Sequence, residues 1–276
     1  MADLFERTNQ PHIDVSDTFR IHSIYTAFER HYDYNYVFRG ERHDFWELVI
    51  VIDGQIGVTA ENDVLTLTKG QAFLHEPMEF HRLWNAENLE TTIIVFTFRA
   101  EHMPAYTSRL FEVDIPTARN VLRRIKSAYE FQMRNVVAVK ENYYAKSQIA
   151  LKHLEMFILE TLTSQSELPE VSVSRSMKNY TTIVNVLENN INKNLSVSDI
   201  ASICNMSEIH LKQTFSRYAG MGVKNYFNRL KVNAAISMLR DGATVQEVSD
   251  SLGFSSQNYF STVFKRITGH VPTYYR

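Results

Sequence analysis

The sequence predicts an α+β protein in which an N-terminal β-barrel and a helical segment precede an all-α domain with two helix-turn-helix units. Three observations lead to this prediction. Short β-branched and aromatic runs alternate with Gly, Asp and Pro turns over residues 34–99. Two stretches with helical periodicity follow within residues 116–163. The last hundred residues contain an internal repeat.

The composition is that of a globular protein of about two domains, because the chain has 276 residues, 44% hydrophobic and 22% charged. The single cysteine, Cys204, excludes an internal disulfide framework and a cysteine-rich zinc site. The first residues lack a basic segment followed by an apolar one, and the longest apolar run, residues 48–52, is too short to span a bilayer. We therefore expect a cytoplasmic protein without membrane contact.

The net charge of −2 hides an asymmetry along the chain. Residues 175–276 carry 12 Lys and Arg against 6 Asp and Glu, whereas residues 1–174 have a balance of −8. Opposite charges in the two parts indicate two domains with different roles. The basic part can bind a polyanion such as a nucleic acid, which the acidic part would repel.

The β-rich part is predicted from five apolar runs separated by turn residues. Asp53-Gly54 is a tight-turn signal, and Pro77 interrupts the pattern after His75. Short strands at this spacing are typical of a sandwich or barrel. The expected strands cover residues 46–52, 55–60, 64–68, 71–75 and 91–98.

Ionisable residues in the first of these runs and just before it are candidates for a site inside the barrel. Alternate side chains of a strand share a face, so Glu41, His43 and Glu47 would lie together and would need partners or a ligand. A metal site of His43, Glu47 and His81 is one alternative, because imidazole and carboxylate suit iron, zinc or manganese. Mutual hydrogen bonding without further function is another. We favour a pocket for a small polar molecule, in which Trp84 either stacks on a sugar ring or simply packs, and predict no metal or other cofactor.

Two spaced motifs resemble those of the cupin family: His43-x3-Glu47-x6-Gly54, and Gly70-x6-Pro77-x3-His81-x3-Asn85. The resemblance implies a jelly-roll barrel. Glu41 stands where the first cupin motif has a second His, and the internal Gly of the second motif is missing. The resemblance therefore supports the fold more than it supports a bound metal.

Two helices are expected after the barrel, one from Pro116 to about residue 129 and one from about Asn142 to Thr163. The apolar surface of the second helix is broad and must be covered on more than one side. It packs against the barrel, forms a dimer interface, or does both. The predicted domains are a barrel (1–108), a helical dimerisation segment (109–164), a linker (165–178) and a DNA-binding domain (179–276).

The internal repeat places two similar units in the basic part of the chain. The capping boxes Ser196-x-x-Asp199 and Thr244-x-x-Glu247 each begin a short helix, and the two copies are 48 residues apart. Each copy continues through a turn into a second helix, and residues 223–239 read as one longer helix between the copies. A short helix, a turn and a second helix form the helix-turn-helix unit, whose second helix fits the major groove of B-DNA.

The last part of the chain resembles the signature of the AraC/XylS family of transcription regulators, over about residues 179–276. The residues that carry it are Gly253-Phe254, Tyr259-Phe260-Ser261, Val263-Phe264-Lys265, Gly269, Pro272 and Tyr275-Arg276. Ser249 stands where the family more often has Ala, which implies only a small packing adjustment. The resemblance implies a sequence-specific regulator, more often an activator, with a cupin-like sensor domain for a sugar or similar polar effector. It also implies a homodimer on a double-stranded DNA operator, with RNA polymerase as a further partner, and no enzymatic activity. The alternative is a metal-dependent cupin enzyme with a helical accessory domain.

Helical phase separates core positions from DNA-facing ones. Leu211 and Phe215, and likewise Phe260 and Phe264, should face the core. By family resemblance the base-facing positions are Ile209, Lys212, Gln213, Gln257, Asn258, Ser261 and Thr262. Gln and Asn can pair with adenine, Lys with guanine, and Ile can pack on a thymine methyl group. Ser216 also faces outward, and we expect phosphate contacts from Arg217, Lys265 and Arg266.

Overall fold

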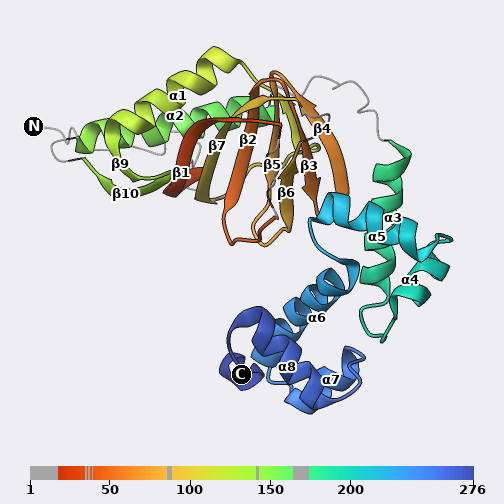
Figure 1. Cartoon of the computed structure of the whole chain (residues 1–276). Helices are drawn as coiled ribbons and strands as arrows, with labels where there is room; N and C mark the ends of the chain where they lie inside the picture. Colours follow the sequence, from red (N-terminus) through yellow and green to blue (C-terminus); the bar gives the residue numbers. More distant parts are fainter. Residues whose placement is uncertain are drawn as a thin grey trace, which may run out of the picture.

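The computed structural model describes residues 18–34, 36, 38, 40–85, 89–140, 143–163 and 174–276. A sheet-rich part with two helices on one side is followed by a helical part that lies at the opposite side of the sheets (Figure 1). The predicted α+β fold class, with a β-rich sensor-like part and an all-α C-terminal part, is confirmed. The predicted linker lies mostly outside the described residues, because only 174–178 of it are described.

The β-rich part consists of two antiparallel sheets that face each other. The larger sheet has the order β8-β5-β2-β7-β1-β10-β9, and the smaller has the order β4-β3-β6. The larger sheet contains β1 (Arg20–Tyr32), β2 (Trp46–Asp53), β5 (Gln71–His75), β7 (Thr91–Glu101), β8 (Leu110–Glu112), β9 (Tyr129–Gln132) and β10 (Asn135–Val139). The smaller sheet contains β3 (Gln55–Ala60), β4 (Asp63–Thr68) and β6 (His81–Trp84).

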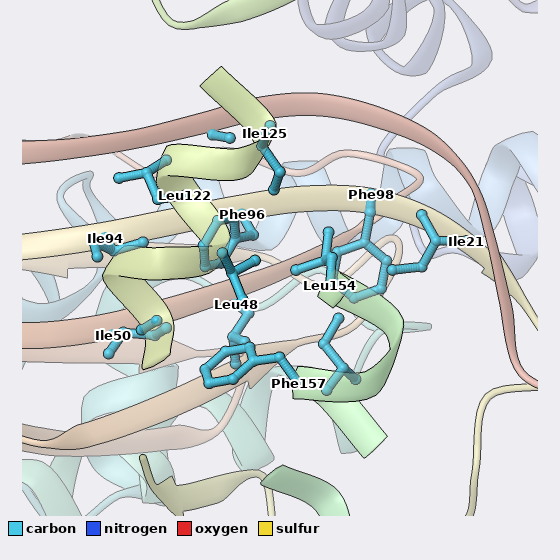
Figure 2. Packing of buried hydrophobic residues seen from close by; sticks show 14 of the residues in the cluster. Ile21, Leu48, Ile50, Ile94, Phe96, Phe98, Leu122, Ile125, Leu154 and Phe157 are labelled. Carbon is cyan, nitrogen blue, oxygen red and sulfur yellow. The ribbon is translucent and has the colours of Figure 1, made fainter. Parts of the chain in front are cut away.

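Both faces of the larger sheet are buried at β2, which explains the nearly continuous apolar sequence of this strand. Val49 and Val51 face the smaller sheet. Leu48 and Ile50 face the opposite way, against helices α1 (Ile115–Ala128) and α2 (Tyr144–Thr163) (Figure 2). The order of layers is therefore helices, larger sheet, smaller sheet.

Five strands were not expected from the sequence: β1, β6, β8, β9 and β10. The expected strands began after residue 34, but β1 is the longest strand and pairs with β7 over nearly its whole length. The hairpin of β9 and β10 separates the two predicted helices and joins the sheet through the pair Thr26 and Asn135. The second helix begins at Tyr144, and the expected start at Asn142 lies outside the described residues.

The helical part contains the predicted duplication. Its helices are α3 (Arg175–Asn189), α4 (Val197–Ile203), α5 (Glu208–Ala219), α6 (Val223–Arg240), α7 (Val245–Ser251) and α8 (Gln257–Thr268), followed by a 3-10 turn over Pro272–Tyr275. Both capping boxes are formed, at Ser196 for α4 and at Thr244 for α7. Gly220 and Gly269 end α5 and α8 in the left-handed conformation that favours glycine.

Helix α6 connects the two units, and each half of it belongs to a different core. Tyr226 and Phe227 pack with α3, α4 and α5, whereas Ala235 and Leu239 pack with α7 and α8. Between them lies the Lys231 side chain, which is only 3% exposed. Its ammonium donates to the carbonyl oxygens of Lys193 at 2.7 Å and Leu252 at 2.6 Å, so one residue ties both units together.

Candidate functional site

A cavity of about 550 Å³ opens between the two sheets, a size suited to a small-molecule ligand. Strands from both sheets and the hairpin contribute to its wall. The lining residues are Thr26, Phe28, Arg30, Tyr32, Tyr36, Phe38, Glu41, His43, Phe45, Glu47, Leu83, Val95, Thr97, Met133, Arg134 and Asn135. The wall combines aromatic rings with charged groups of both signs.

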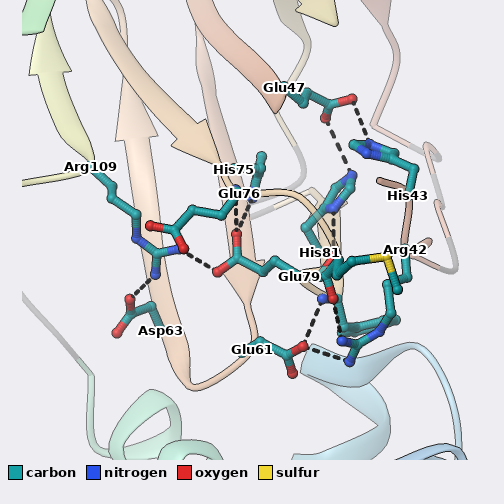
Figure 3. Close-up of polar contacts among 12 residues, drawn as sticks. Arg42, His43, Glu47, Glu61, Asp63, His75, Glu76, Glu79, His81 and Arg109 are labelled. Atoms are coloured by element: carbon teal, nitrogen blue, oxygen red, sulfur yellow. Dashed lines mark hydrogen bonds and ion pairs between the residues drawn. The ribbon is translucent and has the colours of Figure 1, made fainter. Parts of the chain in front are cut away.

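Three of the four predicted ligand-binding residues lie together (Figure 3), and two of them, His43 and Glu47, line this cavity. The carboxylate of Glu47 on β2 lies 3.6 Å from Nε2 of His43 and 3.5 Å from Nε2 of His81 on β6. Glu41 completes the group, with its carboxylate 3.9 Å from Nε2 of His81. The four residues therefore join the two sheets, although the segment that carries His43 is not a regular strand.

The environment sets the protonation states of this cluster. Burial by itself would raise the pKa of Glu47, but His81 and the neighbouring histidines hold it at about 2. Burial lowers the pKa of His81 to about 4 despite the attraction of Glu47. Burial would also lower the pKa of His43, but its interactions with Glu47 raise it above the usual value. At neutral pH a neutral His81 therefore faces an ionised carboxylate.

Trp84 does not lie with the other three residues. On β6, His81 and Leu83 face inward, so Arg82 and Trp84, at the alternate positions, face the helical part. The Trp84 indole donates to Thr59 Oγ1 at 3.1 Å and packs edge-on against the Tyr218 ring at 5.2 Å. Residues three apart on a strand have opposite orientations, a signal that was present in the sequence.

Sequence reasoning missed several residues around the site. Arg30, Tyr32 and Arg134 line the cavity but lie on or beside strands that were not predicted. His75 is fully buried and stacks on His81, with ring centroids 4.5 Å apart. Nδ1 of His75 lies 3.3 Å from the carboxylate of Glu79, four residues later in the chain.

The smaller sheet packs directly on the end of α5, the predicted DNA-reading helix of the first unit. Thr59 Oγ1 donates to the Tyr218 carbonyl at 3.0 Å, and the Arg82 guanidinium donates to the Arg217 carbonyl. The last carbonyls of a helix lack intrahelical donors and carry a partial negative charge, so a hydroxyl and a cation are suitable partners. The Tyr226 hydroxyl adds a 2.9 Å hydrogen bond from α6 to the Glu61 carboxylate. The β-rich part and the first helix-turn-helix unit therefore contact each other through both hydrogen bonds and apolar packing.

The predicted DNA-facing residues lie on the accessible faces of α5 and α8, away from the core residues. Ile209 is 69% exposed although it is apolar, and Lys212 forms a 2.8 Å ion pair with Glu208 within α5. Ser261 is half-buried. The remaining residues are exposed: Gln213, Ser216, Arg217, Gln257, Asn258, Thr262, Lys265 and Arg266.

Comparison with known families accounts for both parts of the chain. Residues 23–138 match the AraC-like ligand binding domain, and residues 200–276 match a helix-turn-helix domain. The chain belongs to the AraC family of transcription regulators. Within the described part of this AraC-family chain, no helix is both long and apolar enough to cross a membrane.

Relatives of known name match this AraC-family chain over nearly its whole length. The transcriptional activator RhaR of Mannheimia succiniciproducens is 23% identical over 91% of each chain. RhaR of Cronobacter sakazakii is 25% identical over 87% of each chain. Among solved structures, an AraC-type regulator from Chromobacterium violaceum is 28% identical over 37% of this chain and 91% of its own, with a TM-score of 0.35. Fatty acid-bound ToxT from Vibrio cholerae is 16% identical over 96% of both chains, with a TM-score of 0.33.

Proposed function

We propose that the chain activates transcription in response to a small polar ligand, such as a sugar, bound in the cavity between the two sheets. Its target would be a double-stranded DNA operator, which a homodimer contacts through α5 and α8, with RNA polymerase as a further partner. The RhaR relatives, which match nearly the whole chain, are named as transcriptional activators, which supports the direction of regulation.

The cavity wall supports a polar ligand with an apolar face. The rings of Phe28 and Phe38 offer flat apolar surfaces, on which the carbon face of a sugar can pack. Arg30, Arg134 and Glu41 supply charged donors and acceptors for hydroxyl groups. This combination of aromatic walls and a few convergent polar groups is typical of sites for small metabolites.

Strand β6 is the observation that carries the proposed regulation. His81 and Leu83 face the cavity side, whereas Arg82 and Trp84 on the same short strand contact the end of α5. A ligand that shifts β6 would also change the contacts with α5, because the residues of β6 that face the cavity and those that contact α5 are direct neighbours in the strand. Ligand control requires such a difference in affinity between two arrangements of the chain.

The outer face of α2 supports the homodimer. Its inner face packs on the larger sheet, but Tyr144, Ile149, Met156 and Leu159 expose apolar side chains between 36% and 76%. Apolar residues spread along one helix are suited to a symmetric contact with a second copy. Sedimentation of the full chain, compared with a variant carrying Ile149→Glu and Met156→Glu, tests this part of the proposal.

DNA selection tests the central proposal. We expect the full chain to enrich one sequence motif from random duplexes, and its affinity to fall steeply as salt rises, because phosphate contacts release counterions. The double variant Lys212→Ala, Gln257→Ala should lose the sequence preference but keep salt-dependent binding. A matched control, Lys69→Ala with Gln132→Ala, changes the same residue types on the β-rich part and should keep the preference. An unchanged preference in the first variant would show that these two residues do not read bases.

A ligand screen on the full chain tests the effector. Mass action predicts that a ligand in the cavity raises the melting temperature. The active compounds should lose this effect in Arg30→Ala and should alter operator affinity in the unchanged chain. Compounds that stabilise the chain equally in Arg30→Ala would bind elsewhere.

A further inference from the structure

The cluster at the inner end of the cavity has features that a ligand pocket for a polar metabolite does not require. Two imidazoles and two carboxylates from both sheets place their donor atoms within 4.8 Å of one another: Glu41, His43, Glu47 and His81. Glu47 and His81 are buried, and His43 is half-buried beside them. Buried ionisable groups require partners that compensate for their loss of hydration.

Nδ1 of each imidazole already has a hydrogen-bond partner. Nδ1 of His43 lies 2.9 Å from the carbonyl oxygen of Phe45, and Nδ1 of His81 lies 3.3 Å from that of Glu79. A carbonyl only accepts, so Nδ1 carries the hydrogen in both rings. In neutral rings the lone pair is then on Nε2. Donation by one ring nitrogen to a carbonyl is the arrangement that orients histidine ligands in metal sites.

Nε2 of each of these two imidazoles lacks a suitable hydrogen-bond partner among the described residues. Among the residues that the structure describes, Nε2 of His43 and of His81 is buried without a hydrogen bond. The nearest oxygens belong to Glu47, at 3.6 Å and 3.5 Å, which is longer than the usual limit of about 3.2 Å for N–H···O. A neutral imidazole with its lone pair toward a carboxylate is also unfavourable, since both groups are acceptors. A cation between them would satisfy every member of the cluster.

The spacing fits a metal ion. With ligand bonds of about 2.0–2.1 Å, adjacent donors of a tetrahedral site are about 3.4 Å apart. The nitrogen–oxygen distances in the cluster are 3.5 Å, 3.6 Å and 3.9 Å. We propose that His43, Glu47 and His81 bind one divalent transition-metal ion in the cavity, with Glu41 as a fourth ligand. Two imidazoles and carboxylates suit zinc or ferrous iron, and cobalt is a spectroscopic substitute for zinc.

The positions of these residues give such an ion a structural consequence. Glu47 belongs to the larger sheet and His81 to the smaller one, so the ion would join the two sheets. Glu41 is paired with His81 through two backbone hydrogen bonds of 3.0 Å and 3.1 Å, which hold its half-exposed side chain at the mouth of the site. Bound ligand could therefore reach the ion from the open part of the cavity. The inference does not depend on the identity of the effector or on DNA binding.

Cobalt titration of the metal-stripped full chain tests the proposal. We expect one equivalent of Co²⁺ to produce visible d–d absorption of a site with fewer than six ligands, and Zn²⁺ to displace it. Zn²⁺ should also raise the melting temperature by mass action. Glu47→Gln keeps the shape of the side chain but removes the anionic ligand, and should weaken binding at least tenfold and abolish the spectrum.

A matched control removes a histidine elsewhere on the sheet. His31 on β1 is 58% exposed, forms a 3.5 Å contact with Glu90 and does not line the cavity. His31→Ala should bind Co²⁺ with unchanged spectrum and stoichiometry. Absence of stoichiometric Co²⁺ and Zn²⁺ binding to the unchanged chain would overturn the proposal, whatever the variants do. Equal binding by a folded Glu47→Gln chain, checked by circular dichroism, would place the ion elsewhere and equally overturn it.

Discussion

Replacing Thr59 by valine should loosen the contact between the β-rich part and the first helix-turn-helix unit. Thr59 is fully buried on β3, and its hydroxyl makes two hydrogen bonds. It accepts from the Trp84 indole at 3.1 Å and donates to the Tyr218 carbonyl at the end of α5 at 3.0 Å. Valine has nearly the same shape, so the substitution removes both hydrogen bonds without leaving a large void.

The expected cost follows from the groups left behind. Each buried donor or acceptor that loses its partner costs about 1–3 kcal/mol, so two such groups give a total of about 2–6 kcal/mol. The Trp84 indole has little room to find another partner. It packs so closely on Gly57 that a Cβ atom there would lie 2.2 Å from the ring. We therefore expect a decrease in the free energy of unfolding within this range.

Fluorescence offers a direct assay because the chain has two tryptophans. In a Trp46→Phe background, Trp84 is the remaining tryptophan and lies at the contact between the two parts. Urea denaturation followed by this emission should show a lower midpoint for Thr59→Val, with native emission shifted to the red as water reaches the ring. Far-UV circular dichroism of the same samples reports whether the helices unfold with the contact.

A second threonine-to-valine change provides the control. Thr66 lies half-buried on the neighbouring strand β4, and Thr66→Val should change stability by less than about 0.5 kcal/mol. If Thr59→Val were as stable as this control and kept the native emission, the two hydrogen bonds would not hold the parts together. The proposed route from β6 to α5 would then lose its structural basis.

Four further changes test the packing and electrostatics of the chain. Lys231→Met should lower the free energy of unfolding by about 2–4 kcal/mol in urea denaturation, because one part-buried and one buried carbonyl lose a charged donor. Ser249→Ala should raise the melting temperature and add about 1 kcal/mol, since the buried Ser249 hydroxyl has no partner among the described residues. Gly253→Ala should cost at least about 2 kcal/mol by the same denaturation assay, because φ is 61° and a Cβ atom would lie 2.3 Å from the Asn192 carbonyl oxygen. Burial lowers the pKa of His81 to about 4, so the unfolded chain binds a proton at this side chain more readily than the folded chain does. The free energy of unfolding should therefore decrease by about 3 kcal/mol as pH falls from about 6.5 to 4. The raised pKa of His43 has the opposite effect, because its contribution to stability is lost as pH rises. The test is therefore the difference in stability between the unchanged chain and His81→Asn across this pH range. Equal pH profiles of the two chains would contradict the assignment.

The helical part could be predicted from the sequence in considerable detail because helix signals are local. The capping boxes at Ser196 and Thr244 connect residues three positions apart, and both are formed where the pattern placed them. The core residues Leu211 and Phe215 follow from their spacing of four and are fully buried. Since a helix forms its own hydrogen bonds, its ends and its inner face can be recognised without knowledge of its neighbours.

The β-rich part could be predicted only in outline. The apolar run of β2 identified a central strand, and the cupin-like spacing brought His43, Glu47 and His81 together correctly. The sequence did not reveal β1, because its pattern of buried and exposed residues is irregular and two bulges interrupt its pairing with β7. A strand is defined by partners far away in the chain, and those partners are absent from any local pattern.

What the sequence by itself determined is the duplicated helical unit, its caps, and the residue types that meet in the cavity. Only the tertiary structure decided that Trp84 packs on Tyr218 and that Thr59 and Arg82 supply donors to the last carbonyls of α5. The physical reason is the difference in range. Helical hydrogen bonds join residues four apart, whereas the contact between β6 and α5 joins residues 135 positions apart in the chain, and its geometry exists only once both parts have folded.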